Sequence, residues 1–144
     1  MGFAFFEMAI LKDGTDEYEV RIKRYPDKTY FDEYVTLSER EEVKARKCDR
    51  YIVGEEGVTY SIEVTLKAGF NFGDFTCVRA SVCLASQYRY QDEIGHVTIR
   101  KRPGDEYRPT TSDITSSIEY ANTKLDGKPM LGARFTFRNL VVGQ

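Results

Sequence analysis

Apolar and polar residues alternate one by one along several stretches of this chain. Between residues 17 and 23, Tyr18, Val20 and Ile22 alternate with charged residues. A period of two places such residues on opposite faces of a β-strand. The strict alternation predicts an antiparallel sheet with one apolar face and one face in contact with water.

The same period continues on both sides of a turn in the segment RYIVGEEGVTYSIEVTL, residues 50–66. Tyr51 and Val53 precede glycine-bounded residues 54–57, which are typical of a turn. We therefore expect a hairpin whose second strand lines the core with four alternating apolar residues. These are Tyr60, Ile62, Val64 and Leu66.

Other stretches predict further strands and the turns between them. Residues 3–11 form one apolar strand, and the Asp-Gly pair within 12–15 marks a turn. Residues 77–84, 96–100 and 133–142 alternate as strands, while residues 114–125 are ambiguous. The segment KAGFNFGDF, residues 67–75, reads as a loop that places aromatic rings against one end of the core.

Seven or eight short strands separated by turn signals predict an all-β fold, an antiparallel β-sandwich. A capping box of Ser38 and Glu41 begins the segment 38–47, so we expect at most one or two short helices. The length of 144 residues corresponds to one domain over residues 1–144.

Composition and charge narrow the classes of function. Hydrophobic residues make up 41% and charged residues 31% of the chain, which is a globular rather than a disordered balance. The formal net charge of -2 argues against a broad nucleic-acid-binding surface. The start, MGFAFFEMAIL, lacks the basic region and cleavage site of a secretory signal and is too short to span a bilayer. We expect a cytoplasmic or nuclear protein without membrane contact.

The three cysteines, Cys48, Cys77 and Cys83, do not have the spacing of a disulfide framework or a zinc site. In one extended strand the Cα atoms of Cys77 and Cys83 would be roughly 20 Å apart, too far for a disulfide. Cys48 could pair with either of them, but buried thiols are the simpler expectation.

Catalytic and cofactor chemistry has little support. The single histidine, His96, is expected to point to solvent, which leaves no partner for a nucleophile. Adjacent carboxylates such as Glu55 and Glu56 are expected in solvated turns rather than across a cleft. We expect no enzyme activity, no metal site and no cofactor.

Tyrosine and arginine cluster in residues 88–108, and both residue types suit recognition of a partner. We predict that a binding site, if there is one, lies in the loops at residues 70–74 and 88–108. The candidate residues are Phe70, Phe72, Asp74, Tyr88, Arg89, Tyr90, Arg100, Arg102, Tyr107 and Arg108. An alternative reading is that these are ordinary strand tyrosines and loop cations.

Several short motifs resemble a large, uncharacterised fungal domain family, often an N-terminal domain of unknown function. The hairpin and loop that carry the resemblance are residues 48–75, and the matching positions are Tyr51, Ile52, Gly57, Tyr60, Ser61, Ile62, Val64, Phe70, Phe72, Gly73 and Asp74. The ending matches through Phe135, Phe137, Asn139 and Leu140. The resemblance implies a compact β-sandwich and brings no known activity or catalytic residue.

We therefore expect a non-enzymatic interaction domain that binds a protein partner or a second copy of itself. A carbohydrate-binding, lectin-like module is the alternative, because exposed tyrosines can stack on sugars, although the absence of Trp weakens it. Nucleic acid is the least favoured ligand.

Overall fold

The computed structural model describes residues 4–6, 9–36, 50–83, 93–125 and 128–137. None of these residues forms a helix. The strands are β1 (Ala4–Phe6), β2 (Ala9–Asp13), β3 (Asp16–Tyr25), β4 (Tyr34–Thr36), β5 (Thr59–Leu66), β6 (Cys77–Cys83), β7 (Glu93–Arg100), β8 (Ile114–Ile118), β9 (Tyr120–Leu125) and β10 (Lys128–Thr136). The segment 38–47, where a short helix was allowed, lies outside the described residues.

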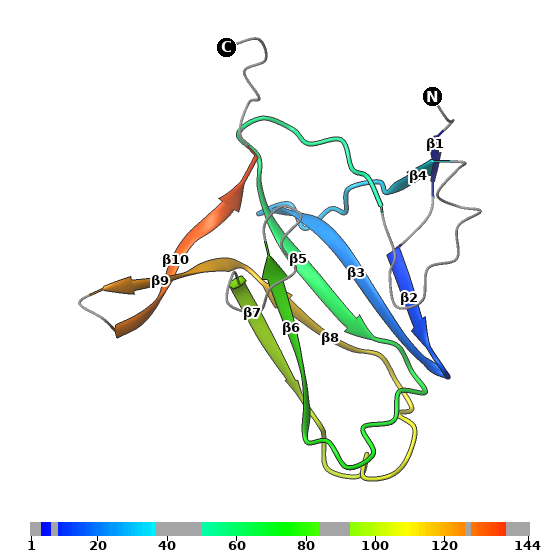
Figure 1. The fold of residues 1–144 in the computed structure, drawn as a ribbon. Coiled ribbons are helices and arrows are strands. Elements are labelled where there is room, and N and C mark those ends of the chain that lie inside the picture. Colours follow the sequence, from blue (N-terminus) through cyan, green and yellow to red (C-terminus); the bar gives the residue numbers. More distant parts are fainter. Residues whose placement is uncertain (1–3, 7–8, 37–49, 84–92, 126–127, 138–144) are drawn as a thin grey trace.

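The main sheet contains six strands, in which β2, β3, β5, β10 and β9 follow one another and β8 also pairs with β5 (Figure 1). Every strand pair in the described part of the chain is antiparallel. The all-β, antiparallel prediction is therefore confirmed. β8 pairs with one half of β5 and β10 with the start of β5, so β9 and β10 continue as a hairpin that extends away from the rest of the sheet (Figure 1).

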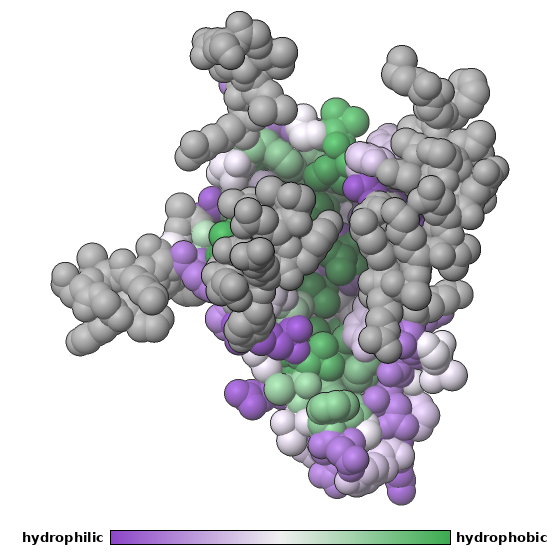
Figure 2. All heavy atoms as spheres, viewed as in Figure 1, coloured by the Kyte–Doolittle hydropathy of each residue, from purple (hydrophilic) through white to green (hydrophobic). Residues whose placement is uncertain are grey.

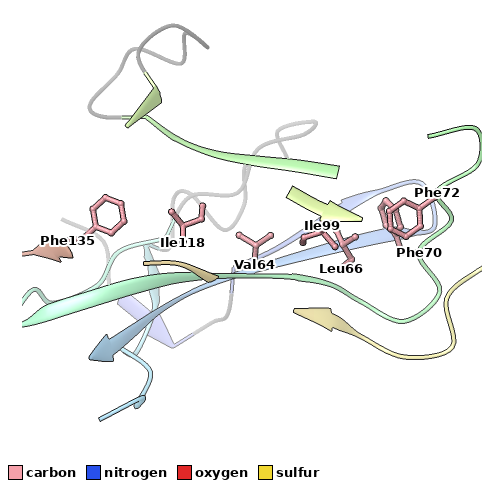
Figure 3. Close-up of a cluster of buried hydrophobic side chains, with 7 residues drawn as sticks. All are labelled: Val64, Leu66, Phe70, Phe72, Ile99, Ile118 and Phe135. Carbon is pink, nitrogen blue, oxygen red and sulfur yellow. The ribbon is translucent and has the colours of Figure 1, made fainter. Parts of the chain in front are cut away.

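The core lies on one face of β5. Period-two alternation puts Val64 and Leu66 on this inner face, where they meet Ile118 of β8 and Phe135 of β10. Figure 3 shows these side chains in a row that ends at Phe70 and Phe72, from the connection after β5. Of the four predicted core residues of this strand, Val64 and Leu66 are buried, and Tyr60 and Ile62 are partly buried against the same cluster. The aromatic rings of the following loop close one end of the core.

The hairpin of β6 and β7 covers this core from the other side. Val78, Ala80 and Val82 of β6, with Val97 of β7, pack against the buried cluster. Gly95 of β7 allows a close approach, because a Cβ atom there would lie only 3.1 Å from Cγ2 of Ile118 and 3.2 Å from a backbone oxygen of β9. The β6–β7 hairpin therefore packs against the same buried cluster as the main sheet.

Val20 is on the predicted inner face but has 39% of its surface exposed. It pairs with Val64 on one side and with Ala9 of β2 on the other. Its neighbour Val64 is buried in the core cluster. The expectation that all three apolar residues of β3 are shielded alike is therefore wrong at this position. Burial decreases from β5 toward the β2 side of the sheet.

The outer face of the same strands is predicted to contact water. This prediction is wrong at the centre of the face, where charged side chains are buried. Glu63 of β5 is only 9% exposed and accepts hydrogen bonds from Lys23 Nζ at 3.0 Å and from Tyr30 OH at 2.7 Å. Glu33, which is 4% exposed, lies 3.3 Å from Nε of Arg21. A buried charge is costly unless it is paired. Glu63 is thus paired with Lys23 of the neighbouring strand, and Glu33, just before β4, is paired with Arg21 of β3. This pairing allows the polar face to be partly buried.

Two further predictions about strands need correction. Residues 3–11 form not one strand but β1 and β2, which belong to different sheets. Residues 50–58 do not form the first strand of a hairpin with β5, because the backbone of Tyr51 pairs with Tyr34 instead, with N–O distances of 2.7 and 2.8 Å. A local sequence pattern cannot show which distant segment takes a strand's hydrogen bonds.

The cysteine and histidine predictions can be checked where the chain is described. Neither Cys77 nor Cys83 forms a disulfide, and both are half-buried rather than fully buried. Cys48 lies outside the described residues. His96 is exposed, as expected, with its ring nitrogen 3.4 Å from the side-chain nitrogen of Asn122.

Candidate functional site

Three connections meet at one end of the domain: the β2–β3 turn, residues 67–76 between β5 and β6, and residues 101–113 between β7 and β8 (Figure 1). Backbone hydrogen bonds join them. The amide of Gly69 donates to the carbonyl oxygen of Thr110 at 2.7 Å, and the amide of Thr110 donates to the carbonyl oxygen of Phe70 at 2.8 Å. The amide of Lys101 donates to the carbonyl oxygen of Thr76 at 2.8 Å. Loops fixed in this way can hold a binding site in place.

The β5–β6 connection has a buried and an exposed part. Phe70 and Phe72 point into the core, whereas Phe75 is 75% exposed. Gly69 and Gly73 have φ angles of 97° and 58°, which favour glycine and let the chain reverse twice in this short segment. The side-chain oxygen of Asn71 accepts a hydrogen bond from the amide of Gly73 at 2.9 Å. The connection therefore anchors itself with two rings and presents a third to solvent.

A pocket of about 520 Å³ lies at this end. Its walls come from the β2–β3 turn, Tyr18 of β3, residues 70–75, and Cys77 and Val78 of β6. At the lower end of Figure 2, where these loops lie, hydrophilic residues adjoin hydrophobic ones. The volume is within the range of about 300–1,000 Å³ that is usual for ligand pockets.

Three carboxylates line the pocket, those of Asp13, Asp16 and Asp74, and no Lys, Arg or His lines it. Asp16 Oδ1 accepts a hydrogen bond from the backbone amide of Asn71 at 3.1 Å, which ties the β2–β3 turn to the β5–β6 connection. Asp74 Oδ1 accepts a hydrogen bond from Tyr107 OH at 2.7 Å. The donors of these two hydrogen bonds are neutral groups, and the three carboxylates give the pocket a net negative charge.

The pKa values of the two tyrosines beside the carboxylates, Tyr18 and Tyr107, are raised. The hydrogen bond to Asp74 raises the pKa of Tyr107, with further contributions from partial desolvation and from Glu106. Burial raises the pKa of Tyr18, and the charges of Asp16 and Asp13 add to the shift. Both phenols therefore stay protonated at neutral pH and act as hydrogen-bond donors rather than as bases.

Tyr107 is held in an exposed position. Its side chain is 70% exposed, and its φ angle of 54° lies in the left-handed region, which a bulky residue rarely adopts. Its hydroxyl group is fixed by Asp74 from a different connection. Two large aromatic rings, Phe75 and Tyr107, thus stand in water near one set of carboxylates.

The predicted site residues do not all lie together in the structure. Asp74 and Tyr107 are brought together, as their hydrogen bond shows. Phe70 and Phe72 belong to the buried core, 4% and 1% exposed, and part of each borders the pocket. Such rings are buried because they close the end of the core.

The arginines of the predicted site do not line the pocket. Arg102 is engaged within its own loop, with Nε 3.0 Å from Asp105 and another guanidinium nitrogen 3.2 Å from Ser112. Arg100 and Arg108 are exposed. Tyr88, Arg89 and Tyr90 lie outside the described residues.

Sequence reasoning missed Asp13, Asp16, Tyr18 and Phe75. The Asp-Gly signal identified the β2–β3 turn but gave no reason to place it beside residues 70–75. That placement follows from the register of β3 and β5, in which Tyr18 lies opposite Leu66 and the amide of Lys67 donates to the carbonyl oxygen of Glu17. The sequence therefore indicated the β2–β3 turn, but it did not indicate that this turn lies beside residues 70–75.

Metal and membrane chemistry find no structural support in the described part of the chain. No group of three or more His, Cys, Asp or Glu side chains there is arranged to hold a metal ion. No helix among the described residues is long and apolar enough to span a bilayer. Glu55 is exposed in the segment before β5, where a guanidinium nitrogen of Arg24 donates a hydrogen bond to it at 2.7 Å.

Comparison with known proteins identifies a family but no characterised relative. No curated protein and no solved structure matches the chain. A family model described as a domain of unknown function, DUF7918, matches residues 18–144. The match includes β3, β5 and the β5–β6 and β7–β8 connections, and leaves out the β2–β3 turn with Asp13 and Asp16. Since the match covers most of the chain, this chain belongs to the DUF7918 family of domains of unknown function.

Proposed function

We propose that this domain is a non-enzymatic interaction module that binds a protein partner with the loop end described above. One observation carries the proposal: an open pocket is flanked by Phe75 and Tyr107, two aromatic side chains that are 75% and 70% exposed. Exposing large rings in water costs free energy, and aromatic residues are enriched where proteins bind one another. Their place beside a pocket distinguishes them from scattered surface residues.

The chemistry of the pocket favours binding over catalysis. The pocket contains carboxylates and phenols, and the raised pKa values of Tyr18 and Tyr107 make neither phenol a base at neutral pH. A general base needs a pKa near the working pH and a proton within hydrogen-bond reach. The pocket chemistry is better suited to recognition.

Selection of peptides from a random displayed library against the immobilised domain tests this proposal. We expect enriched peptides whose binding falls at least about tenfold in the double variant Phe75→Ala/Tyr107→Ala, because hot-spot aromatics commonly contribute 2 kcal/mol or more. Val53→Ala is the matched control, since Val53 is an apolar side chain with 71% exposure before β5 rather than after it. Peptides that bind the double variant as tightly as the wild type would contradict the proposal.

A carbohydrate ligand is the second candidate, because carboxylates next to exposed rings also suit sugar hydroxyl groups and ring faces. A glycan array with the same three proteins separates the two candidates. A glycan signal that is lost in the double variant, with no peptide enriched, would favour the sugar. Self-association is a further form of the first candidate, and light scattering of the wild type and the double variant would detect it.

A further inference from the structure

We infer that the loop-end pocket receives the basic side chain of a lysine or arginine from an extended segment of a partner protein. This inference rests on the proposed interaction function and adds the chemistry of the residue that is recognised. Three observations support it: the negative charge of the pocket, the aromatic rings in its walls, and the ion pairs that nearby lysine and arginine side chains form outside it.

Charge is the first argument. Asp13, Asp16 and Asp74 line the pocket without a lining Lys, Arg or His. The hydrogen bonds that Asp16 and Asp74 accept come from the neutral amide of Asn71 and the neutral phenol of Tyr107. Neutral donors satisfy lone pairs but leave the negative charge in place. A cationic group is the complement of such a site.

Two cations of the same loops, Lys67 and Arg102, form ion pairs outside the pocket. Lys67 lies 3.2 Å from Asp113 and 3.7 Å from Glu19. Arg102 lies 3.0 Å from Asp105. Asp113, Glu19 and Asp105 therefore have cationic partners. Among the described residues, no ion pair is found for the three carboxylates of the pocket.

The walls of the pocket indicate a side chain with an apolar stem. Tyr18, Phe70, Phe72 and Phe75 contribute rings to them. Lysine and arginine bury their methylene groups along apolar surface while their charged ends reach polar groups. A cation near an aromatic ring is also attracted by the ring quadrupole, worth about 0.5–1 kcal/mol, or roughly two- to fivefold in affinity, at exposed sites. A bare metal ion would gain little from these rings.

The test is a double-mutant cycle on the peptides recovered by selection. Each Lys is replaced by norleucine and each Arg by citrulline, and binding is measured by fluorescence anisotropy at low salt. We expect one basic position whose replacement weakens binding about tenfold or more. Asp13→Asn and Asp74→Asn should each weaken binding of the parent peptide about two- to fivefold and have almost no effect on the replaced peptide.

Three controls check that the effect is local to the pocket, that the variants are folded, and that a free amine is not the ligand. Glu56→Gln removes one exposed carboxylate before β5, so it should leave binding unchanged if the effect is local. Thermal unfolding should show that Asp13→Asn retains the wild-type midpoint, because Asp13 is exposed. Butylammonium, the free analogue of a lysine end, should compete only weakly.

The outcomes separate this inference from the proposed function. Peptides that bind through Phe75 and Tyr107 but tolerate replacement of every basic residue would overturn the inference and leave the function standing. Additive effects of the peptide and Asp13 or Asp74 changes would overturn it as well, because the basic residue would then lie elsewhere. Butylammonium binding as tight as the peptide would overturn it in favour of a free amine. If no peptide binds through the pocket, the proposed function fails too.

Discussion

The inner and outer faces of β5 are both shielded from water, but by different chemistry. On the inner face, Val64 and Leu66 are covered by apolar residues of β6, β7 and β8. On the outer face, Glu63 and Thr65 are nearly as buried. There, Glu63 is hydrogen bonded to Lys23 and Tyr30, and the hydroxyl groups of Thr65 and Thr115 lie 2.9 Å apart.

The comparison shows that the alternation of apolar and polar residues assigns each residue to one face of a strand. It does not show which face is exposed to water. A polar residue can be buried when its partners come from neighbouring strands in register. Arg21 and Lys23 of β3 lie opposite Glu63 and Ser61 of β5 in this way. Apolar burial contributes by area, whereas the outer face depends on complete pairing of each charge. The two faces should therefore fail differently when they are mutated.

The largest effect is expected from Leu66→Ala on the inner face. Leu66 is fully buried, so its truncation leaves a cavity and should lower the free energy of unfolding by about 2–5 kcal/mol. Val20→Ala is the matched control on the same face, and since Val20 is 39% exposed its cost should be below about 1 kcal/mol. Urea denaturation measures both. Equal losses would show that the β2 side of the sheet is covered as well as the centre.

An intermediate effect is expected from Glu63→Ala on the outer face. The change leaves the ammonium group of Lys23 and the hydroxyl group of Tyr30 without their carboxylate, which should cost about 1–3 kcal/mol. The control is Glu56→Ala, an exposed carboxylate in the turn before β5, with an expected change within about 0.5 kcal/mol. If Glu63→Ala changes stability no more than Glu56→Ala, the outer network is not a source of stability.

The smallest expected effect is on the pH dependence of stability. It tests the outer face of β5 without removing a side chain. Desolvation raises the pKa of Glu63, but the hydrogen bonds from Tyr30 and Lys23 and the charges of Lys23 and Arg21 outweigh it, so the pKa is lowered. A carboxylate with a lowered pKa in the folded state stabilises the protein above its unfolded-state pKa of about 4.3. That contribution is lost as the pH falls through the folded-state pKa.

Glu63→Gln should therefore lose less stability than the wild type between pH 5 and the acid limit of folding, by a fraction of a kcal/mol up to about 1 kcal/mol. Thermal unfolding midpoints across this range provide the measurement. Leu66→Ala carries no titrating change and should keep the wild-type pH dependence. A parallel profile for Glu63→Gln would show that another carboxylate dominates acid unfolding.

Some strands and turns of this fold could be predicted from local sequence patterns, because strand alternation and turn formation depend on neighbouring residues. The alternation in β3, β5 and β6 identified these strands, and the Asp-Gly pair identified the β2–β3 turn, where Gly14 has a φ angle of 64°. The division of residues 3–11 into β1 and β2 was not predicted. Both strands are apolar, and nothing in the segment shows that it pairs first with β4 and then with β3.

The candidate site was predictable only in part. Asp74 and Tyr107 belong to segments chosen for their loop composition, and they do contact each other. Phe75 was overlooked beside Phe70 and Phe72, although Phe75 is the ring that reaches solvent. Which of three neighbouring phenylalanines is exposed depends on the turns at Gly69 and Gly73, which composition alone does not set.

By itself, the sequence determined the antiparallel, all-β class and which residues of each strand share a face, because side-chain direction repeats every two residues in any extended chain. Only the tertiary structure decided that the charged face of β5 is partly buried and that three distant connections form one acidic, aromatic pocket. Both depend on which strands pair and in what register. Strand pairing joins residues far apart in the chain, so no local pattern contains it.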